Sequence, residues 1–172
     1  MHPLENEFAL SAQEILDIVS RAPRLKQAVK GWIAEEHLAR YFSSLNLTFN
    51  RIERDGEPDF EIITPNGRVR VECKNVMSGS NLYANGDFKV DFQKTRNSMN
   101  KPQSRFYKPD EFEILAACLH NQTGRWEFLF IRTRDLPRDK EYYDCLKKQV
   151  RVPNIHNTTN IEPWQREIMD LL

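Results

Sequence analysis

The chain has 172 residues, a formal net charge of zero, an apolar fraction of 40% and a charged fraction of 29%. This length is typical of one domain, which we expect to span residues 1–172 and to bury a core without disulfides or structural metals. The sequence has no run of about 20 apolar residues and no basic export signal, so we expect no membrane span. Zero net charge weakens the case for a general polyanion binder, but leaves room for acids at a centre with bases around it.

The three cysteines are odd in number and far apart in the chain: Cys73, Cys118 and Cys145. This usage indicates a reducing compartment, so we expect a cytoplasmic protein. The spacing also argues against a zinc site, which needs closely paired ligands.

Two helices are predicted near the N-terminus. Residues 11–22 begin with a serine cap and place Glu14 at the capping-box position. Residues 24–47 follow Pro23 and show a longer helical pattern. Its apolar face collects Ala28, Gly31, Ala34, Leu38, Phe42 and Leu45. Glycine costs a helix interior about 1 kcal/mol relative to alanine, so we expect close packing against a sheet at Gly31.

The apolar period then changes from helical spacing to two. Three short strands are predicted at 47–54, 58–64 and 68–76, with turn signals between them. The later segments are predicted as a strand running into a helix at 88–101 and a hairpin at 111–133. A helix at 139–149, a short strand at 150–155 and a last helix at 163–172, starting at Pro163, follow. This order predicts an α/β or α+β fold with a mixed central sheet flanked by helices. Its core covers about 24–133, and a helical extension covers 139–172.

The third strand carries a group of charged side chains. Strand alternation places Glu72 and Lys74 side by side on one face and Cys73 on the other. The turn at 65–67 can pair this strand with the one before it, which would bring Asp59 near Glu72. Two carboxylates with a backbone carbonyl, such as that of Cys73, make a hard oxygen site for Mg²⁺. A nearby lysine can orient an attacking water and offset charge in a phosphoryl transition state.

Pro58-Asp59 followed by Glu72-Cys73-Lys74 resembles the PD-(D/E)xK nuclease superfamily, which has the restriction-endonuclease-like fold. The resemblance implies an αβββαβ core and Mg²⁺-dependent hydrolysis of DNA phosphodiester bonds, with Mn²⁺ as a substitute. It also implies that Asp59 and Glu72 bind the metal and that Lys74 acts at the attacking water. The alternative is a solvated strand face with an accidental ladder of Arg, Glu and Lys.

A glutamate on the preceding helix, commonly within GxxxE, accompanies this motif in many relatives. Gly31 and Glu35 match that pattern. Glu35 lies beside the apolar stripe, whereas Glu36 precedes Arg40 by four residues and is expected to form an exposed ion pair. We interpret Glu35 as a metal ligand, either direct or through water; the alternative is a surface acid. Gln93 partly matches a glutamine near the scissile phosphate in many relatives, and its alternative is a polar helix start.

The segment 94–108 contains bases and no acids. Its five bases are Lys94, Arg96, Lys101, Arg105 and Lys108. Bases with Ser, Asn and Gln suit contacts to a nucleic-acid backbone, so we predict a DNA clamp beside the active site. The alternative is a solvated loop anchored by Phe106 and Tyr107.

These observations favour a Mg²⁺-dependent DNA endonuclease that is restriction-like or associated with defence or repair. One alternative is a catalytically silent nucleic-acid-binding or scaffold module of a larger complex, but the intact Asp59, Glu72 and Lys74 speak against it. A second is a mixed α/β protein whose motif is accidental. A homodimer is expected, because cutting both strands with one active site per chain usually needs two chains.

Overall fold

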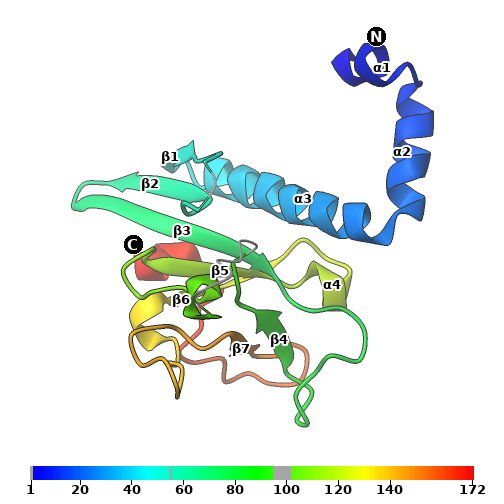
Figure 1. Ribbon diagram of the computed structural model, residues 1–172. Coiled ribbons are helices and arrows are strands. Elements are labelled where there is room, and N and C mark those ends of the chain that lie inside the picture. Colours follow the sequence, from blue (N-terminus) through cyan, green and yellow to red (C-terminus); the bar gives the residue numbers. More distant parts are fainter. Residues whose placement is uncertain (1, 55, 95–101) are drawn as a thin grey trace.

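A five-stranded mixed sheet forms the centre of the protein in the computed structural model, which describes residues 2–54, 56–94 and 102–172 (Figure 1). Its strands, in spatial order, are β1 (Thr48–Arg51), β2 (Phe60–Thr64), β3 (Gly67–Asn75), β5 (Ile114–Cys118) and β6 (Phe128–Arg132). Only the β3–β5 pair is parallel among these neighbours. A second sheet pairs β4 (Phe88–Asp91) with β7 (Gln149–Val152). The α+β class and the predicted β1–β3 and β5–β6 segments are therefore confirmed.

The remaining elements are helical. The α-helices are α1 (Pro3–Phe8), α2 (Ala12–Arg21), α3 (Pro23–Ser44) and the single turn α4 (His120–Thr123). The 3₁₀ helices are η1 (Pro102–Arg105), η2 (Thr133–Asp135) and η3 (Ile168–Leu171). Within the described residues, no helix is both long and apolar enough to cross a membrane.

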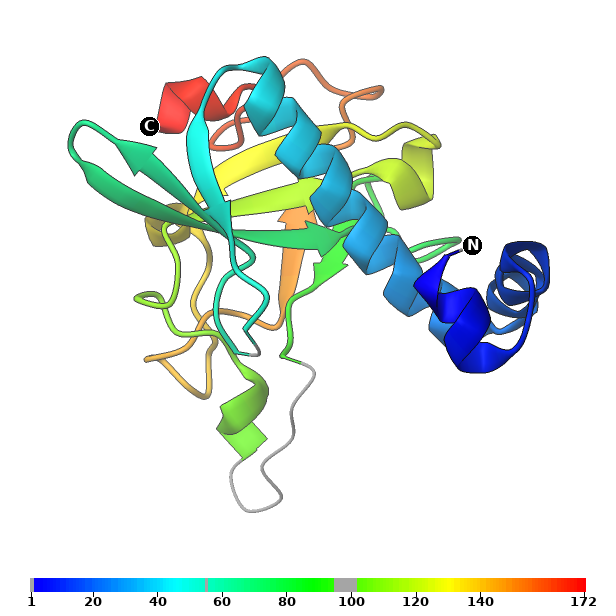
Figure 2. The ribbon, with the colours of Figure 1, turned by 90° about the horizontal axis from the view of Figure 1, so that it is seen from above.

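Helix α3 lies diagonally across one face of the central sheet (Figure 2). Ala34, Leu38 and Phe42 recur at helical spacing and are buried against the sheet, as predicted. The ring of Phe42 meets that of Phe60 on β2 edge to face, with centroids 5.4 Å apart. These contacts fix the height of α3 above β2 and β3.

The other face of the sheet is covered by the β4–β7 sheet and its loops rather than by a helix. Val90 of β4 and Val150 of β7 pack into the core cluster that contains Leu115 of β5. The described parts of the β3–β5 crossover, 76–94 and 102–113, contain β4 and η1 where the αβββαβ order predicts an α-helix. The helix predicted within 88–101 falls largely on 95–101, which lies outside the described residues.

The helical extension predicted at 139–172 is wrong, apart from the short strand, which is β7. Residues 139–149 contain no helix, because local bonds compete with helix formation: the Asp139 carboxylate accepts hydrogen bonds from the backbone N–H groups of Glu141 and Tyr142. The backbone N–H of Leu146 donates instead to the carbonyl of Tyr107. After Pro163, only η3 is helical.

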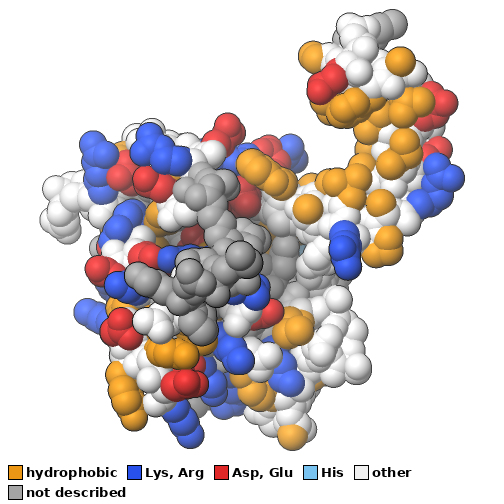
Figure 3. Space-filling model, in the orientation of Figure 1, with side chains coloured by type: hydrophobic (Ala, Val, Ile, Leu, Met, Phe, Trp, Pro, Cys, Tyr) orange, Lys and Arg blue, Asp and Glu red, His pale blue; other side chains and the backbone are white. Residues whose placement is uncertain are grey.

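The N-terminal helices α1 and α2 project from the body of the molecule (Figure 1). The predicted capping box at Ser11 and Glu14 is present, and neither helix has a buried residue. Apolar side chains lie along the arm, and Leu16 is 62% exposed (Figure 3). The three cysteines lie elsewhere, and all are buried and free.

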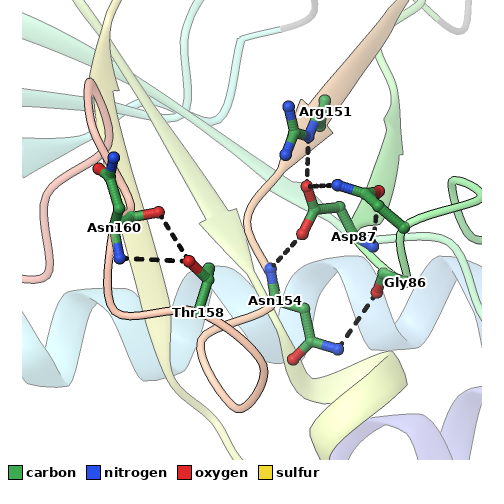
Figure 4. Close-up of polar contacts among 7 residues, drawn as sticks. Gly86, Asp87, Arg151, Asn154, Thr158 and Asn160 are labelled. Atoms are coloured by element: carbon green, nitrogen blue, oxygen red, sulfur yellow. Dashed lines mark hydrogen bonds and ion pairs between the residues drawn. The ribbon is translucent and has the colours of Figure 1, made fainter.

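A buried aspartate joins the loop before β4 to the segment after β7 (Figure 4). One oxygen of Asp87 accepts from the backbone N–H of Asn154 at 3.0 Å, and the other accepts from the Asn85 amide at 2.8 Å and from Arg151. The Asn154 amide in turn donates to the Gly86 carbonyl at 3.1 Å. This network links the start of β4 to the end of β7, which lie at the same end of the small sheet.

Replacing Asp87 tests the contribution of this network. Asp87→Ala leaves the partly buried donors of Asn85 and Asn154 without an acceptor, so we expect the free energy of unfolding to fall by roughly 2–3 kcal/mol in urea denaturation. Asp91→Ala, on the exposed side of β4, is the control and should change it by less than about 0.5 kcal/mol. Equal effects of the two substitutions would contradict a structural role for the network.

Candidate active site

A cavity of about 280 Å³ opens where α3, the start of β2 and the middle of β3 meet. Six of the residues singled out from the sequence line it: Glu35, Asp59, Glu72, Lys74, Gln93 and Lys94. These residues come from four separate stretches of the chain. The tertiary structure therefore brings together the acids, the amide and the lysine that the motifs selected.

The pairing of β2 with β3 positions Asp59. Because Phe60 lies opposite Val71, the residue before β2 falls beside Glu72 and Cys73. Asp59 Oδ2 accepts a hydrogen bond from the backbone N–H of Cys73 at 2.7 Å. The predicted approach of Asp59 to Glu72 rests on this register.

Glu72 is buried, with 3% of its surface exposed. Its Oε1 lies 2.5 Å from Lys74 Nζ, so the pair predicted from strand alternation is present. The solvated ladder proposed as an alternative fits Arg68 and Arg70, which pair at the surface with other acids. It does not fit Glu72.

Tyr107 completes the environment of Glu72, whereas the sequence suggested it only as an aromatic anchor of the segment 94–108. Its hydroxyl donates to Glu72 Oε1 at 2.5 Å, and its ring stacks on Phe92 with centroids 4.6 Å apart. Lys74 Nζ and Lys94 Nζ lie 5.6 Å and 5.3 Å from the centroid of the same ring. The only local signal for Tyr107 was an aromatic within a basic segment, and its approach to Glu72 depends on the crossover after β4.

The helical interpretation of Glu35 and Glu36 is confirmed. The Glu35 side chain is 19% exposed and lines the cavity, whereas that of Glu36 is 48% exposed and bonds Arg40 at 3.0 Å. Arg51 of β1 reaches both acids, at 3.0 Å from Glu35 and 3.3 Å from Glu36. Sequence reasoning did not identify this arginine, which partly compensates the charge of Glu35.

The close packing expected at Gly31 is wrong. A Cβ built on Gly31 would meet no heavy atom of the described residues within 4 Å beyond its immediate neighbours along the helix. The residue lines an open groove on the side of α3 next to the cavity.

The basic segment is only partly described. Lys94 pairs with Glu111, and Arg105 Nε donates to the Lys94 carbonyl at 3.2 Å. Lys108 is exposed. Arg96 and Lys101 lie outside the described residues. Since Glu111 compensates the charge of Lys94, the described part of the segment presents less free positive charge than its composition indicates.

The pKa values show that the cavity holds an excess of acid. Burial, followed by the charge of Glu72, raises the pKa of Asp59 to about 7. Burial also raises the pKa of Glu35, although Arg51 opposes the shift. Burial alone would lower the pKa of Lys74, but the carboxylate of Glu72 outweighs it and the net pKa is raised. Lys74 is therefore charged at neutral pH.

The chemistry of the donor set fits a hard divalent cation, because six carboxylates of the described residues line the cavity. Three of them, Glu35, Asp59 and Glu72, are the predicted metal ligands, and the pKa of Asp59 is raised to about 7. Each of these acids already has a partner: Arg51 for Glu35, the Cys73 N–H for Asp59, and Lys74 for Glu72. Accordingly, the described residues contain no three His, Cys, Asp or Glu side chains already arranged around a metal position. A metal would have to exchange with these partners. The Cys73 carbonyl stays a predicted ligand.

Comparison with known structures finds a similar fold. The structure of a bacterial homing endonuclease, I-Ssp6803I, matches 81% of this chain and 82% of its own, with a TM-score of 0.51 and 15% sequence identity. The chain shares its fold with an endonuclease. No family model matches the sequence, and no curated protein matches it.

The raised pKa of Asp59 predicts a pH-dependent effect on stability. The folded pKa of about 7 exceeds the unfolded value near 3.9, so the native state binds the proton more tightly and stability falls as pH rises from about 4 to 7. Asp59→Asn removes this cost and keeps an acceptor for the Cys73 N–H. We expect it to stabilise the metal-free protein by on the order of 2 kcal/mol at pH 8 and by close to zero at pH 4.

Chemical denaturation at the two pH values measures this difference. Asp91→Asn serves as the control, because Asp91 is exposed on β4 and lines neither the cavity nor the core. A loss of stability in Asp59→Asn at pH 8 would show that the charged carboxylate stabilises the fold.

Proposed function

We propose that the chain is a metal-dependent endonuclease that hydrolyses phosphodiester bonds in DNA. The observation that carries this proposal is the meeting of Glu35, Asp59 and Glu72 with Lys74 in one cavity. The fold shared with a homing endonuclease supports it independently. Membership of the PD-(D/E)xK superfamily is the family assignment that best fits both.

Mg²⁺ is the metal that we propose for this site, with Mn²⁺ as a substitute. Asp59 and Glu72 would hold it, together with the Cys73 carbonyl and with Glu35 either directly or through water. Such an ion polarises a phosphoryl oxygen and lowers the pKa of a bound water.

Three side chains of the cavity could bind and orient the substrate and the proposed metal ligand Glu72. Lys74 keeps its proton at neutral pH and can donate to a phosphate oxygen or orient the attacking water. Tyr107 donates to Glu72 and limits the orientations of its carboxylate. Gln93 lines the same cavity and can donate its amide N–H to the scissile phosphate. These groups can bind and orient the phosphodiester before reaction.

DNA is the proposed substrate because the structural neighbour is an endonuclease of the homing class. A backbone clamp is proposed at Lys94, Arg96, Lys101, Arg105 and Lys108; of these, Lys94 lines the cavity, while Arg96 and Lys101 lie outside the described residues. We also propose a restriction-like role, or one in defence or repair, and a homodimeric state. One set of catalytic residues per chain cuts one strand, so a double-strand break would need two chains.

One observation favours the alternative of a catalytically silent nucleic-acid-binding module. Each of the three proposed metal ligands, Glu35, Asp59 and Glu72, already has a protein partner, and Lys74 Nζ lies 2.5 Å from Glu72 Oε1, where a metal would compete with it. Metal binding and cleavage therefore decide between the two functions.

A metal titration and a cleavage assay test the proposal together. We expect the wild type to bind Mn²⁺ in calorimetry and to cleave plasmid DNA with Mg²⁺ or Mn²⁺. Asp59→Ala and Glu72→Gln should each lower cleavage by at least about 10³-fold, since each removes a metal ligand. Glu61→Gln changes an acid that pairs with Arg68 and does not line the cavity, so it should cleave as the wild type does. DNA binding without metal binding or cleavage by the wild type would establish the silent module.

Replacing Lys74 should affect metal affinity and DNA cleavage differently. Lys74→Gln removes the cation that competes for Glu72, so we expect Mn²⁺ to bind as tightly as in the wild type or more tightly. Cleavage should fall by roughly 10²–10⁴-fold because the charged donor is gone. Lys89→Gln, a base on β4 that lies over Tyr83, is the matched control. A variant that loses metal affinity and activity in parallel would argue that Lys74 only supports the structure.

A further inference from the structure

A second groove of about 490 Å³ adjoins the candidate active site. It shares Glu35, Lys74 and Gln93 with the first cavity, so the two spaces meet at the residues proposed to handle the scissile phosphate. Its volume falls within the roughly 300–1,000 Å³ of typical ligand sites. A strand whose phosphate lies at Lys74 would therefore have open space on both sides.

On the α3 side, the lining of the groove includes residues with small or absent side chains. Ala28 and Gly31 line it, and a Cβ at Gly31 would have no described heavy atom within 4 Å outside the neighbouring part of the helix. Glycine is among the least favourable residues for a helix interior, and no contact in the structure requires it at this position. The lack of a side chain at Gly31 leaves space in the groove.

Neutral amides and two acids also line the groove. The amides include Gln27 of α3, Asn75 at the end of β3 and Asn81 in the loop that follows, and the acids are Glu35 and Asp91. Among the described residues, Lys74, at the junction with the first cavity, is the only basic residue of the lining. The amide groups of Asn75 and Asn81 donate to the backbone carbonyls of Lys30 and Ser78, at 3.2 Å and 3.0 Å. This leaves their oxygens as acceptors. Side-chain amides can hydrogen-bond the edges of nucleobases and the sugars as well as phosphates. With two carboxylates and one lysine among the described lining residues, the groove suits the uncharged nucleoside better than a second phosphate.

We propose that this groove binds the nucleoside next to the scissile phosphate and that Gly31 determines which substrates enter it. The inference rests on the proposed nuclease function and adds a subsite to it. The phosphate lies at Lys74 and Gln93, and the adjoining sugar and base lie over Gly31 within reach of Asn75 and Asn81. A side chain at position 31 would occupy the space that the nucleoside needs.

Substitutions at Gly31 should separate folding from binding. In Gly31→Leu, we expect the affinity for a short fluorescein-labelled DNA duplex, measured by anisotropy without metal at fixed salt, to weaken by about tenfold. Gly31→Ala should weaken it less. Both variants should melt at the same or a higher temperature than the wild type, because each replaces glycine in a helix. Mn²⁺ affinity, measured by calorimetry, should stay unchanged.

Two further variants serve as controls. Ser43→Leu adds the same side chain at an exposed position of α3 that lines neither space, and it should bind DNA as the wild type does. Gln27→Ala removes an exposed amide from the groove without touching the core. Gln27→Ala should weaken DNA binding about threefold. If Gly31→Leu fails to fold, this variant alone tests whether the groove binds DNA.

The outcomes separate the subsite from the nuclease function. If the wild type cleaves DNA, while Gly31→Leu and Gln27→Ala bind and cleave as it does, the subsite is wrong and the nuclease stands. If the wild type neither binds nor cleaves DNA, both proposals fall. Weaker binding by the folded groove variants, with unchanged Mn²⁺ affinity, supports the subsite.

Discussion

Negative charge buried at the junction of β2 and β3 is the constraint on which the rest of the site depends. An ionised carboxylate removed from water costs several kcal/mol unless hydrogen bonds and opposite charges compensate it. Glu72 receives this compensation from Lys74, two residues along the same strand, and from Tyr107 across the crossover. Asp59 receives it from the Cys73 N–H. A slip of one residue in β3 would turn Glu72 toward the α3 face and remove these partners, so the charge specifies the register.

The same constraint links stability to chemistry. The acids of the cavity are only partly compensated, which is why burial and the charge of Glu72 raise the pKa of Asp59 to about 7. Arg51 and Lys74 occupy the positions beside Glu35 and Glu72 that a divalent cation would compete for. Functional sites often retain such unfavourable charge because the ligand relieves it. Protonation of Asp59 relieves this excess of negative charge, and the metal proposed for the site would relieve it as well.

The architecture places this junction at the meeting of two different coverings of the sheet. Helix α3 packs on one face through Ala34, Leu38 and Phe42 and carries Glu35 to the cavity. The other face is closed by the β4–β7 sheet, and the segment after β4 brings Gln93 to the cavity from that side. The site therefore draws on both layers, and the groove beside it opens where α3 presents Gly31.

Local geometry was enough to predict the helices α2 and α3, the first three strands, the choice of Glu35 over Glu36 and the pairing of Glu72 with Lys74. Periods of 3.6 and 2 decide which side chains share a face within a few residues. Tyr107, Arg51 and the open space at Gly31 had no comparable signal, because each depends on segments that meet only when the whole chain packs. The helix predicted at 139–149 failed for the same reason: its periodicity was helical, but the Asp139 turn and the bond from Leu146 to Tyr107 hold the chain in another conformation.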